Sequence, residues 1–150
     1  MDLVIRSIEE DDVDQIAEIE KECFATPWPR EAFLTEIREN KLARYIVAEV
    51  DGKLAGYGGM WLIINEAHIT NIAVKKEYRG LGIGNRIVES LIYYCTAHNI
   101  ERMTLEVRKS NIVAQNLYKK YGFVEYGIRP RYYADNNEDA VIMWRTNKLR

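Results

Sequence analysis

The stretch Arg79-Gly80-Leu81-Gly82-Ile83-Gly84 lies between a predicted strand that ends at Val74 and a predicted helix with an apolar stripe. Glycines at such a place let several backbone N–H groups turn toward one point. The N-terminus of the following helix adds partial positive charge, and Arg79 can add a full one at the entrance. The loop is therefore predicted to bind an anion, most naturally a pyrophosphate.

The glycine spacing departs from two common nucleotide-binding motifs. A dinucleotide-binding loop reads G-x-G-x-x-G and opens the first of several β-α-β units, whereas Asn85 holds the last position here. A P-loop ends in Gly-Lys-Ser or Gly-Lys-Thr, where this chain has Gly84-Asn85-Arg86. Taken alone, the loop also allows a glycine-rich connection that binds no ligand.

The residues before the loop predict three strands joined by short turns. We expect strands at residues 45–50, 53–64 and 68–74, and Asp51-Gly52 suits a hairpin turn with positive φ. Gly58-Gly59 inside the middle strand indicates a bulge or a close approach of another backbone. Consecutive strands with such short turns form an antiparallel meander.

Two helices are predicted ahead of the meander. A short strand at residues 3–5 precedes a helix that the acidic residues 9–12 open, where negative charge suits the helix dipole. Thr26-Pro27-Trp28-Pro29 ends this helix, and a second helix is expected at residues 30–40.

The second half of the chain predicts two helices and three strands. The helix after the loop has an apolar stripe of Ile87, Val88, Leu91, Ile92 and Cys95. A strand at residues 103–107 and a helix at residues 114–121 follow, and two strands near 124–129 and 139–145 end the fold. Residues 129–133 are assigned to the loop between the last two strands. Because a strand, a helix and a strand imply a crossover, we expect an α/β (α+β) domain with a mixed sheet.

The composition is that of an ordinary globular protein. The 150 residues suit one domain spanning 1–150, with 47% apolar residues and a formal net charge of −2. Without a basic excess or a long apolar run, we expect no direct nucleic-acid binding, no membrane contact and a cytoplasmic location. No Cys/His cluster has metal-ligand spacing, so no metal is expected. Cys23 and Cys95 are predicted to be buried, reduced thiols.

Two blocks of the sequence together resemble the signatures of the GNAT superfamily of N-acetyltransferases. In the first, Asn71-Ile72-Ala73-Val74 leads to the loop, where Arg79, Gly82 and Gly84 fill the pattern Arg/Gln-x-x-Gly-x-Gly/Ala. The second block, residues 105–123, reads LEVRKSN and then LYKKYGF. The resemblance covers nearly the whole chain. It implies the GNAT fold, a mixed and mostly antiparallel sheet of about seven strands with helices on both faces.

The resemblance also implies acetyl-CoA as the co-substrate. Two strands would splay apart, so that the pantetheine arm pairs with exposed backbone groups as an added strand would. The loop would hold the pyrophosphate, and the side-chain amide of Asn111 would bind the cofactor as well. The full set of implied cofactor residues is Ile72, Ala73, Val74, Arg79, Gly80, Leu81, Gly82, Ile83, Gly84, Asn85 and Asn111.

Within the superfamily, the chain is most similar to the ribosomal-protein-alanine N-acetyltransferases, the RimI branch. As in that branch, Pro27-Trp28 follows the first helix, and Arg131-Tyr132-Tyr133 precedes Glu138-Asp139-Ala140. Arg79-Gly80 departs from a Gln-Arg pair seen in some members. The implied partner is a protein N-terminus, the N-terminal alanine of a small-subunit ribosomal protein, and a monomer is expected.

Two side chains would carry the chemistry. Strand alternation alone also allows Glu106 to be an exposed surface residue, and Tyr118 could be a core aromatic. The resemblance makes Glu106 the general base, acting through water, and Tyr118 the proton donor to the leaving sulfur. One carboxylate with no second base suits an α-amine, whose reference pKa is roughly 8, against roughly 10.4 for lysine.

Four aromatic side chains are predicted to contact the acceptor. By resemblance, Tyr132 and Tyr133 would clamp the backbone of the substrate's first residues. Phe24 and Trp28 would form the opposite wall of the groove, although core or turn packing is an equal alternative for both.

Two other functions stay open on the sequence alone. The first is a GNAT enzyme that acts on lysine side chains, polyamines or antibiotics. The second is a module that senses acetyl-CoA without turnover, which the presence of both Glu106 and Tyr118 disfavours. His68 and His98 are interpreted as structural residues.

Overall fold

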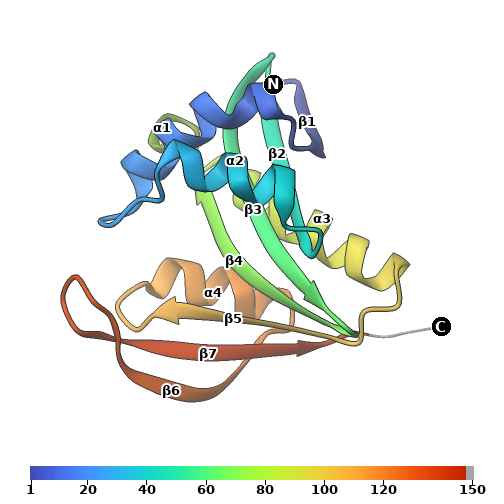
Figure 1. Ribbon diagram of the computed structural model, residues 1–150. Coiled ribbons are helices and arrows are strands. Elements are labelled where there is room, and N and C mark those ends of the chain that lie inside the picture. The colour runs from blue at the N-terminus through green and yellow to red at the C-terminus, as the bar shows by residue number, and fades with distance from the viewer. Residues whose placement is uncertain (148–150) are drawn as a thin grey trace.

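A computed structural model describes residues 1–147 of the chain as a seven-stranded sheet flanked by helices (Figure 1). The strands are β1 (Leu3–Ser7), β2 (Ala43–Val50), β3 (Lys53–Ile63), β4 (Glu66–Val74), β5 (Arg102–Arg108), β6 (Val124–Tyr133) and β7 (Glu138–Thr146). The helices are α1 (Val13–Cys23), α2 (Arg30–Glu39), α3 (Ile83–Ala97) and α4 (Ile112–Lys120), with 3₁₀ turns η1 (Glu10–Asp12) and η2 (Lys76–Tyr78). None of the helices within residues 1–147 is both long and apolar enough to cross a membrane.

The strand order is β1-β2-β3-β4-β5-β7-β6, and every neighbouring pair is antiparallel except β4 and β5. The parallel pair follows from the crossover through α3, because a helix returns the chain to the same end of the sheet. This arrangement confirms the prediction of a mixed, mostly antiparallel α/β fold.

Strands β4 and β5 are paired at one end only. Their register joins Glu66 to Arg102 and ends at the pair of His68 and Thr104. Beyond that point the strands diverge, as Figure 1 shows. The backbone of Ile69–Val74 that faces β5 is therefore left without a strand partner on that side, as the predicted splay requires.

Helices cover both faces of the sheet because the central strands are apolar on both sides. On β3, Leu54 and Tyr57 belong to the core under α1 and α2, whereas Ala55 and Met60 belong to the core under α3. In Figure 1, α1 and α2 lie in front of β2 and β3, and α3 lies behind them. Helix α4 packs on the α3 side, where Tyr118 joins that core.

A bulge lies at the predicted level of Gly58-Gly59, but its extra residue is on the partner strand β4. Gly59 pairs with Asn71 and Met60 pairs with Ile69, so Thr70 of β4 has no partner on β3. A Cβ on Gly59 would collide with the ring of Tyr45, which explains the glycine. The bulge lies at the level where β4 leaves β5, and it locally changes the direction of the strand.

The sheet edge differs from the prediction. Residues 129–133, expected in a loop, form the last part of β6, and only residues 134–137 connect it to β7. Pairing with β7 shifts between Arg129 and Tyr133, and Arg131 has a φ of 51°. Pro130 is compatible with this strand because β6 is the edge of the sheet, where a missing N–H breaks no ladder.

Candidate active site

The glycine loop presents backbone N–H groups without backbone partners. Gly80 and Gly82 have φ of 81° and 82°, in the left-handed region that favours glycine. The first N–H to bond back into the start of α3 is that of Arg86, which donates to the Gly82 carbonyl at 3.2 Å. Within the described part of the chain, the N–H groups of residues 80–85 have no backbone acceptor. They can therefore receive an anion at the N-terminus of a 15-residue helix.

Replacing Gly82 with alanine is expected to weaken coenzyme A binding by about tenfold, because the left-handed φ costs a side chain roughly 1–2 kcal/mol. A Cβ at Gly82 would meet no atom within 4 Å, so the cost comes from the positive φ, and a change of φ would turn the N–H groups away from the anion. Calorimetric titration with coenzyme A measures the effect. Gly127→Ala is the matched control, since Gly127 has equal space and no positive φ. Equal affinities for Gly82→Ala and the wild type would contradict the assignment of the loop.

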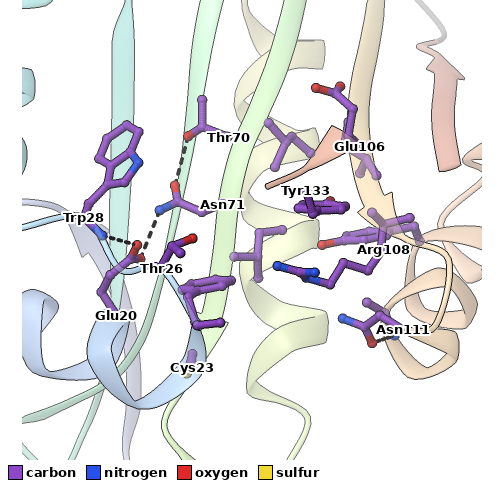
Figure 2. A pocket seen from close by; sticks show the side chains of 18 residues that line it. Glu20, Cys23, Thr26, Trp28, Thr70, Asn71, Glu106, Arg108, Asn111 and Tyr133 are labelled. Atoms are coloured by element: carbon purple, nitrogen blue, oxygen red, sulfur yellow. Dashed lines mark hydrogen bonds between the residues drawn. The ribbon is translucent and has the colours of Figure 1, made fainter. Parts of the chain in front are cut away.

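Two adjoining cavities lie where β4 and β5 diverge, and they share part of their lining. The loop cavity extends from the glycine loop to α4. The carboxylate cavity contains Glu20 on one side and Glu106 on the other (Figure 2). Residues that line both are Cys23, Phe24, Ile72, Asn111, Ala114 and Tyr118. A bound molecule could therefore reach from the loop to the two carboxylates.

Most of the predicted cofactor residues line the loop cavity, namely Ile72, Ala73, Val74, Arg79, Gly80, Gly82, Ile83, Gly84, Asn85 and Asn111. Leu81 is not part of that lining and is 53% exposed. Asn111 caps the N-terminus of α4, where its side-chain oxygen accepts a hydrogen bond from Ala114 N–H at 3.1 Å. Within residues 1–147 its NH₂ group forms no hydrogen bond, so it could bind a ligand.

Arg79 folds back against β4 and α1. Its Nε donates to the Val74 carbonyl at 3.0 Å, and its Nη2 lies 3.3 Å from Cys23 Sγ. Cys23 is only half-buried, which corrects the prediction for this thiol, whereas Cys95 is buried as predicted. Burial raises the pKa of Cys23 although Arg79 opposes the shift, so the thiol contributes to both cavities in its neutral form.

Glu106 is enclosed rather than exposed. On β5 it points away from the core formed by Leu105 and Val107, as alternation predicts, yet its side chain is only 10% exposed. Tyr132 Oη donates to Glu106 Oε1 at 3.1 Å. Burial raises the pKa of Glu106, but bonds from His68 and Tyr132 outweigh it, and the pKa is lowered overall. The carboxylate is thus ionised at neutral pH and can accept a proton.

His68 is the partner of Glu106 that the sequence did not reveal. Its Nε2 lies 2.9 Å and 3.1 Å from the two carboxylate oxygens. The contact arises because His68 pairs with Thr104 in the parallel register, and Glu106 follows two residues later on the same face of β5. The assignment of His68 as purely structural, with no second base near Glu106, is therefore corrected.

Tyr118 projects from α4 toward the junction of the two cavities and lines both. Its ring packs edge-on against Phe123 with centroids 5.8 Å apart, so it is also a core aromatic. Burial raises its pKa, with a smaller contribution from Tyr133, so the phenol keeps its proton. Its hydroxyl has no hydrogen-bond partner among residues 1–147, and the proton is available to a ligand.

The predicted acceptor residues surround the carboxylate cavity. Phe24, Trp28 and Tyr133 line it, and Tyr132 reaches it through its bond to Glu106. The rings of Tyr132 and Tyr133 meet at 90° with centroids 5.1 Å apart. The two tyrosines that are predicted to clamp the acceptor therefore lie at the end of a strand, next to Glu106, rather than in a loop.

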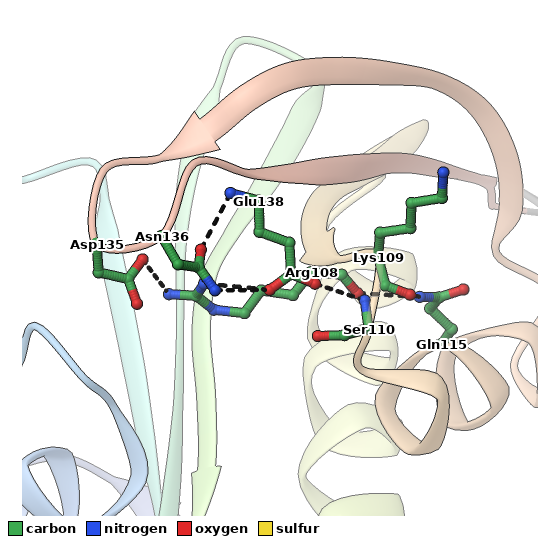
Figure 3. Close-up of polar contacts among 7 residues, drawn as sticks. All are labelled: Arg108, Lys109, Ser110, Gln115, Asp135, Asn136 and Glu138. Carbon is green, nitrogen blue, oxygen red and sulfur yellow. Dashed lines mark hydrogen bonds and ion pairs between the residues drawn. The ribbon is translucent and has the colours of Figure 1, made fainter.

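Arg108 attaches the β6–β7 hairpin to the start of α4 (Figure 3). Its guanidinium forms ion pairs with Asp135 at 3.0 Å and with Glu138 at 3.4 Å, and lies 4.0 Å from the centre of the Tyr133 ring. Glu138 also accepts the Ser110 N–H at 2.6 Å. In the sequence, Arg108 is part of the second signature block but has no predicted role. In the structure, its contacts with the hairpin and with the Tyr133 ring orient Tyr133.

The fold and the site agree with a known family. The sequence matches the family described as "Acetyltransferase (GNAT) family" over residues 13–123, and the chain belongs to that family. GNAT-family enzymes are acetyltransferases that use acetyl-CoA.

Named relatives resemble almost the entire chain. A Bacillus subtilis protein, a putative ribosomal protein bS18-alanine N-acetyltransferase, is 47% identical over 142 residues, covering 95% of this chain and 94% of its own length. An N-alpha-acetyltransferase of Sulfurisphaera tokodaii is 37% identical and covers 93% of this chain and 90% of its own. The crystal structure of the ribosomal-protein-S18-alanine N-acetyltransferase from Escherichia coli has a TM-score of 0.91 at 31% identity, covering 99% of this chain and 96% of that one. The similarity to this branch confirms the resemblance seen in the sequence.

Proposed function

We propose that this protein transfers the acetyl group of acetyl-CoA to a protein N-terminal α-amine, that of an N-terminal alanine of a small-subunit ribosomal protein. The observation that carries the proposal is the position of Tyr118 in the lining shared by two adjoining cavities, one formed by the glycine loop and the other by Glu106. The names of the relatives in Bacillus subtilis and Escherichia coli support the choice of acceptor.

The residues present fit acetyl-CoA. The free N–H groups of residues 80–85 suit its pyrophosphate, and the unpaired edge of β4 suits the amides of its pantetheine arm. Asn111 would hold the arm through its free NH₂ group. When bound, acetyl-CoA supplies the acetyl group as a reactive thioester.

Glu106 and Tyr118 would move the two protons that the reaction requires. The attacking amine must lose a proton, and Glu106, which is ionised, would accept it through water. The departing thiolate must gain a proton, and Tyr118 has one to donate. Because an α-amine has a reference pKa about 2.4 units below that of lysine, it costs about 3 kcal/mol less to neutralise.

His68→Ala is expected to shift the acidic limb of the pH profile of kcat/KM to higher pH. Burial raises the pKa of Glu106 and His68 lowers it, so the pKa of Glu106 should rise when the imidazole is lost. A higher pKa means that the carboxylate becomes protonated, and inactive as a base, at a higher pH than in the wild type. His98→Ala is the control, because His98 stacks on Tyr94 away from both cavities. An unshifted limb in His68→Ala would argue against Glu106 as the titrating base.

The function is tested by acetyl transfer to an Ala-starting peptide that copies the N-terminus of the ribosomal protein. An N-terminally blocked copy that contains lysine runs beside it. Transfer to the free peptide alone supports the proposal. Transfer to the blocked peptide alone indicates a lysine acetyltransferase, and failure with both, while coenzyme A still binds, refutes the proposed acceptor.

A further inference from the structure

Glu20 is a buried carboxylate at the edge of the carboxylate cavity that the proposed chemistry does not use. It lies in the last turn of α1 and is 3% exposed. Figure 2 shows it on the side of the cavity opposite Glu106. It does not line the loop cavity.

The carboxylate of Glu20 joins three separate segments. One oxygen accepts the backbone N–H of Trp28 at 2.9 Å, and the other accepts the hydroxyl of Tyr57 in a short hydrogen bond. Asn71, next to the β4 bulge, donates to the Tyr57 hydroxyl at 3.1 Å and approaches Glu20 at 3.5 Å. The α1–α2 connection is thereby tied to β3 and to the wall of the cavity on β4.

Burying a carboxylate of this kind carries a large desolvation penalty, so it is a poor source of folding stability. Among residues 1–147 no lysine or arginine forms an ion pair with Glu20, so neutral donors alone replace its hydration. A well-packed apolar residue would give equal or greater stability at such a site. The carboxylate instead fixes geometry, because its two oxygens hold the Trp28 backbone at a set distance from Asn71.

We propose that Glu20 is a positioning residue for the acceptor amine. It holds the Trp28 segment against β4, so that this wall of the carboxylate cavity meets the first residue of the acceptor at a fixed distance from Glu106. The inference rests on the proposed function, because it assigns this cavity to the acceptor. Acetyl-CoA binding should depend little on Glu20, since the glycine loop belongs to the other cavity.

Glu20→Gln tests the proposal with almost no change in volume. An amide cannot accept both hydrogen bonds as a carboxylate does, and losing a charge-assisted bond of this type corresponds to roughly a 10- to 100-fold effect. We expect the KM for the peptide to rise at least about tenfold and the KM for acetyl-CoA to change less than about twofold. Glu18→Gln is the control, because it removes the same charge from the same helix at a side chain that is 72% exposed.

Hydrogen exchange provides a second measurement that needs no substrate. The Trp28 N–H donates to Glu20, so exchange in residues 24–29 should accelerate in Glu20→Gln and stay unchanged in Glu18→Gln. If Glu20→Gln does not fold, Tyr57→Phe removes one donor while keeping the ring, and it should raise the KM for the peptide in the same direction.

The outcomes separate this inference from the proposed function. Unchanged exchange at residues 24–29, or an equal rise in the KM for both substrates, overturns the positioning role. If the wild type acetylates no peptide, the proposed acceptor is wrong. If exchange still accelerates in Glu20→Gln in that case, the conclusion that Glu20 anchors Trp28 is retained.

Discussion

Glu106→Gln should lower kcat/KM for acetyl transfer to the Ala-starting peptide by about 10²- to 10⁴-fold, the usual contribution of a general base. The amide keeps the size of the side chain and can still bond His68 and Tyr132. It cannot accept a proton, however, so the amine would have to lose its proton to bulk water. Initial rates with saturating acetyl-CoA at neutral pH measure the effect.

Two controls show whether the loss of activity in Glu106→Gln comes from the proton-transfer step or from weaker binding or misfolding. The affinity for coenzyme A should stay within about twofold of the wild type, because Glu106 does not line the loop cavity. Glu125→Gln, a change at an edge-strand side chain that is 50% exposed, should leave the rate unchanged. A Glu106→Gln variant that retains more than about a tenth of wild-type kcat/KM would exclude this carboxylate as the base.

Tyr118→Phe is expected to lower kcat by about 10²-fold, with little change in the KM for either substrate. The ring remains packed against Phe123, so the change removes a hydroxyl and creates no cavity in the core. Without that hydroxyl, the thiolate must leave unprotonated. Tyr126→Phe is the control, since Tyr126 is 77% exposed on β6.

The role of Tyr118 as an acid can be separated from a structural role by changing the leaving group. An acetyl thioester of a more acidic thiol needs less help to depart. The deficit of Tyr118→Phe should therefore shrink with such a donor. A deficit of the same size with both donors would show that Tyr118 acts by packing or binding and not by donating a proton.

The fold could be predicted from sequence where hydrophobic periodicity and turn chemistry agree. The stripe from Ile87 to Cys95 and the Asp51-Gly52 turn are local signals, and both elements lie where expected. Residues 129–133 are predicted as a loop because Pro130 and its four polar or aromatic neighbours do not show the pattern of a strand. Only pairing with β7, which no local signal specifies, makes that segment a strand.

The candidate site was less visible because it depends on contacts across strands. The alternation of residues on β5 correctly predicts that Glu106 points away from the core. It does not predict that His68 lies 2.9 Å from the carboxylate. That distance depends on the β4–β5 register, which a single sequence does not encode locally. The role of Glu20 is hidden for the same reason, because on a helical wheel it is one acidic residue among several. Its contacts with Tyr57 and Trp28 come from the tertiary fold.

The short β4–β5 pairing makes the stability of the protein depend on what it binds. The edge of β4 from Ile69 to Val74 lacks a strand partner toward β5, so backbone groups on that edge form no sheet hydrogen bonds to β5. A ligand that completes this edge binds only the folded chain, and each increment of occupancy shifts the unfolding equilibrium. At a concentration of about 100 times its Kd, such a ligand would add about 2.7 kcal/mol to the free energy of unfolding. The cellular level of the ligand would then help to set how long the protein survives proteolysis.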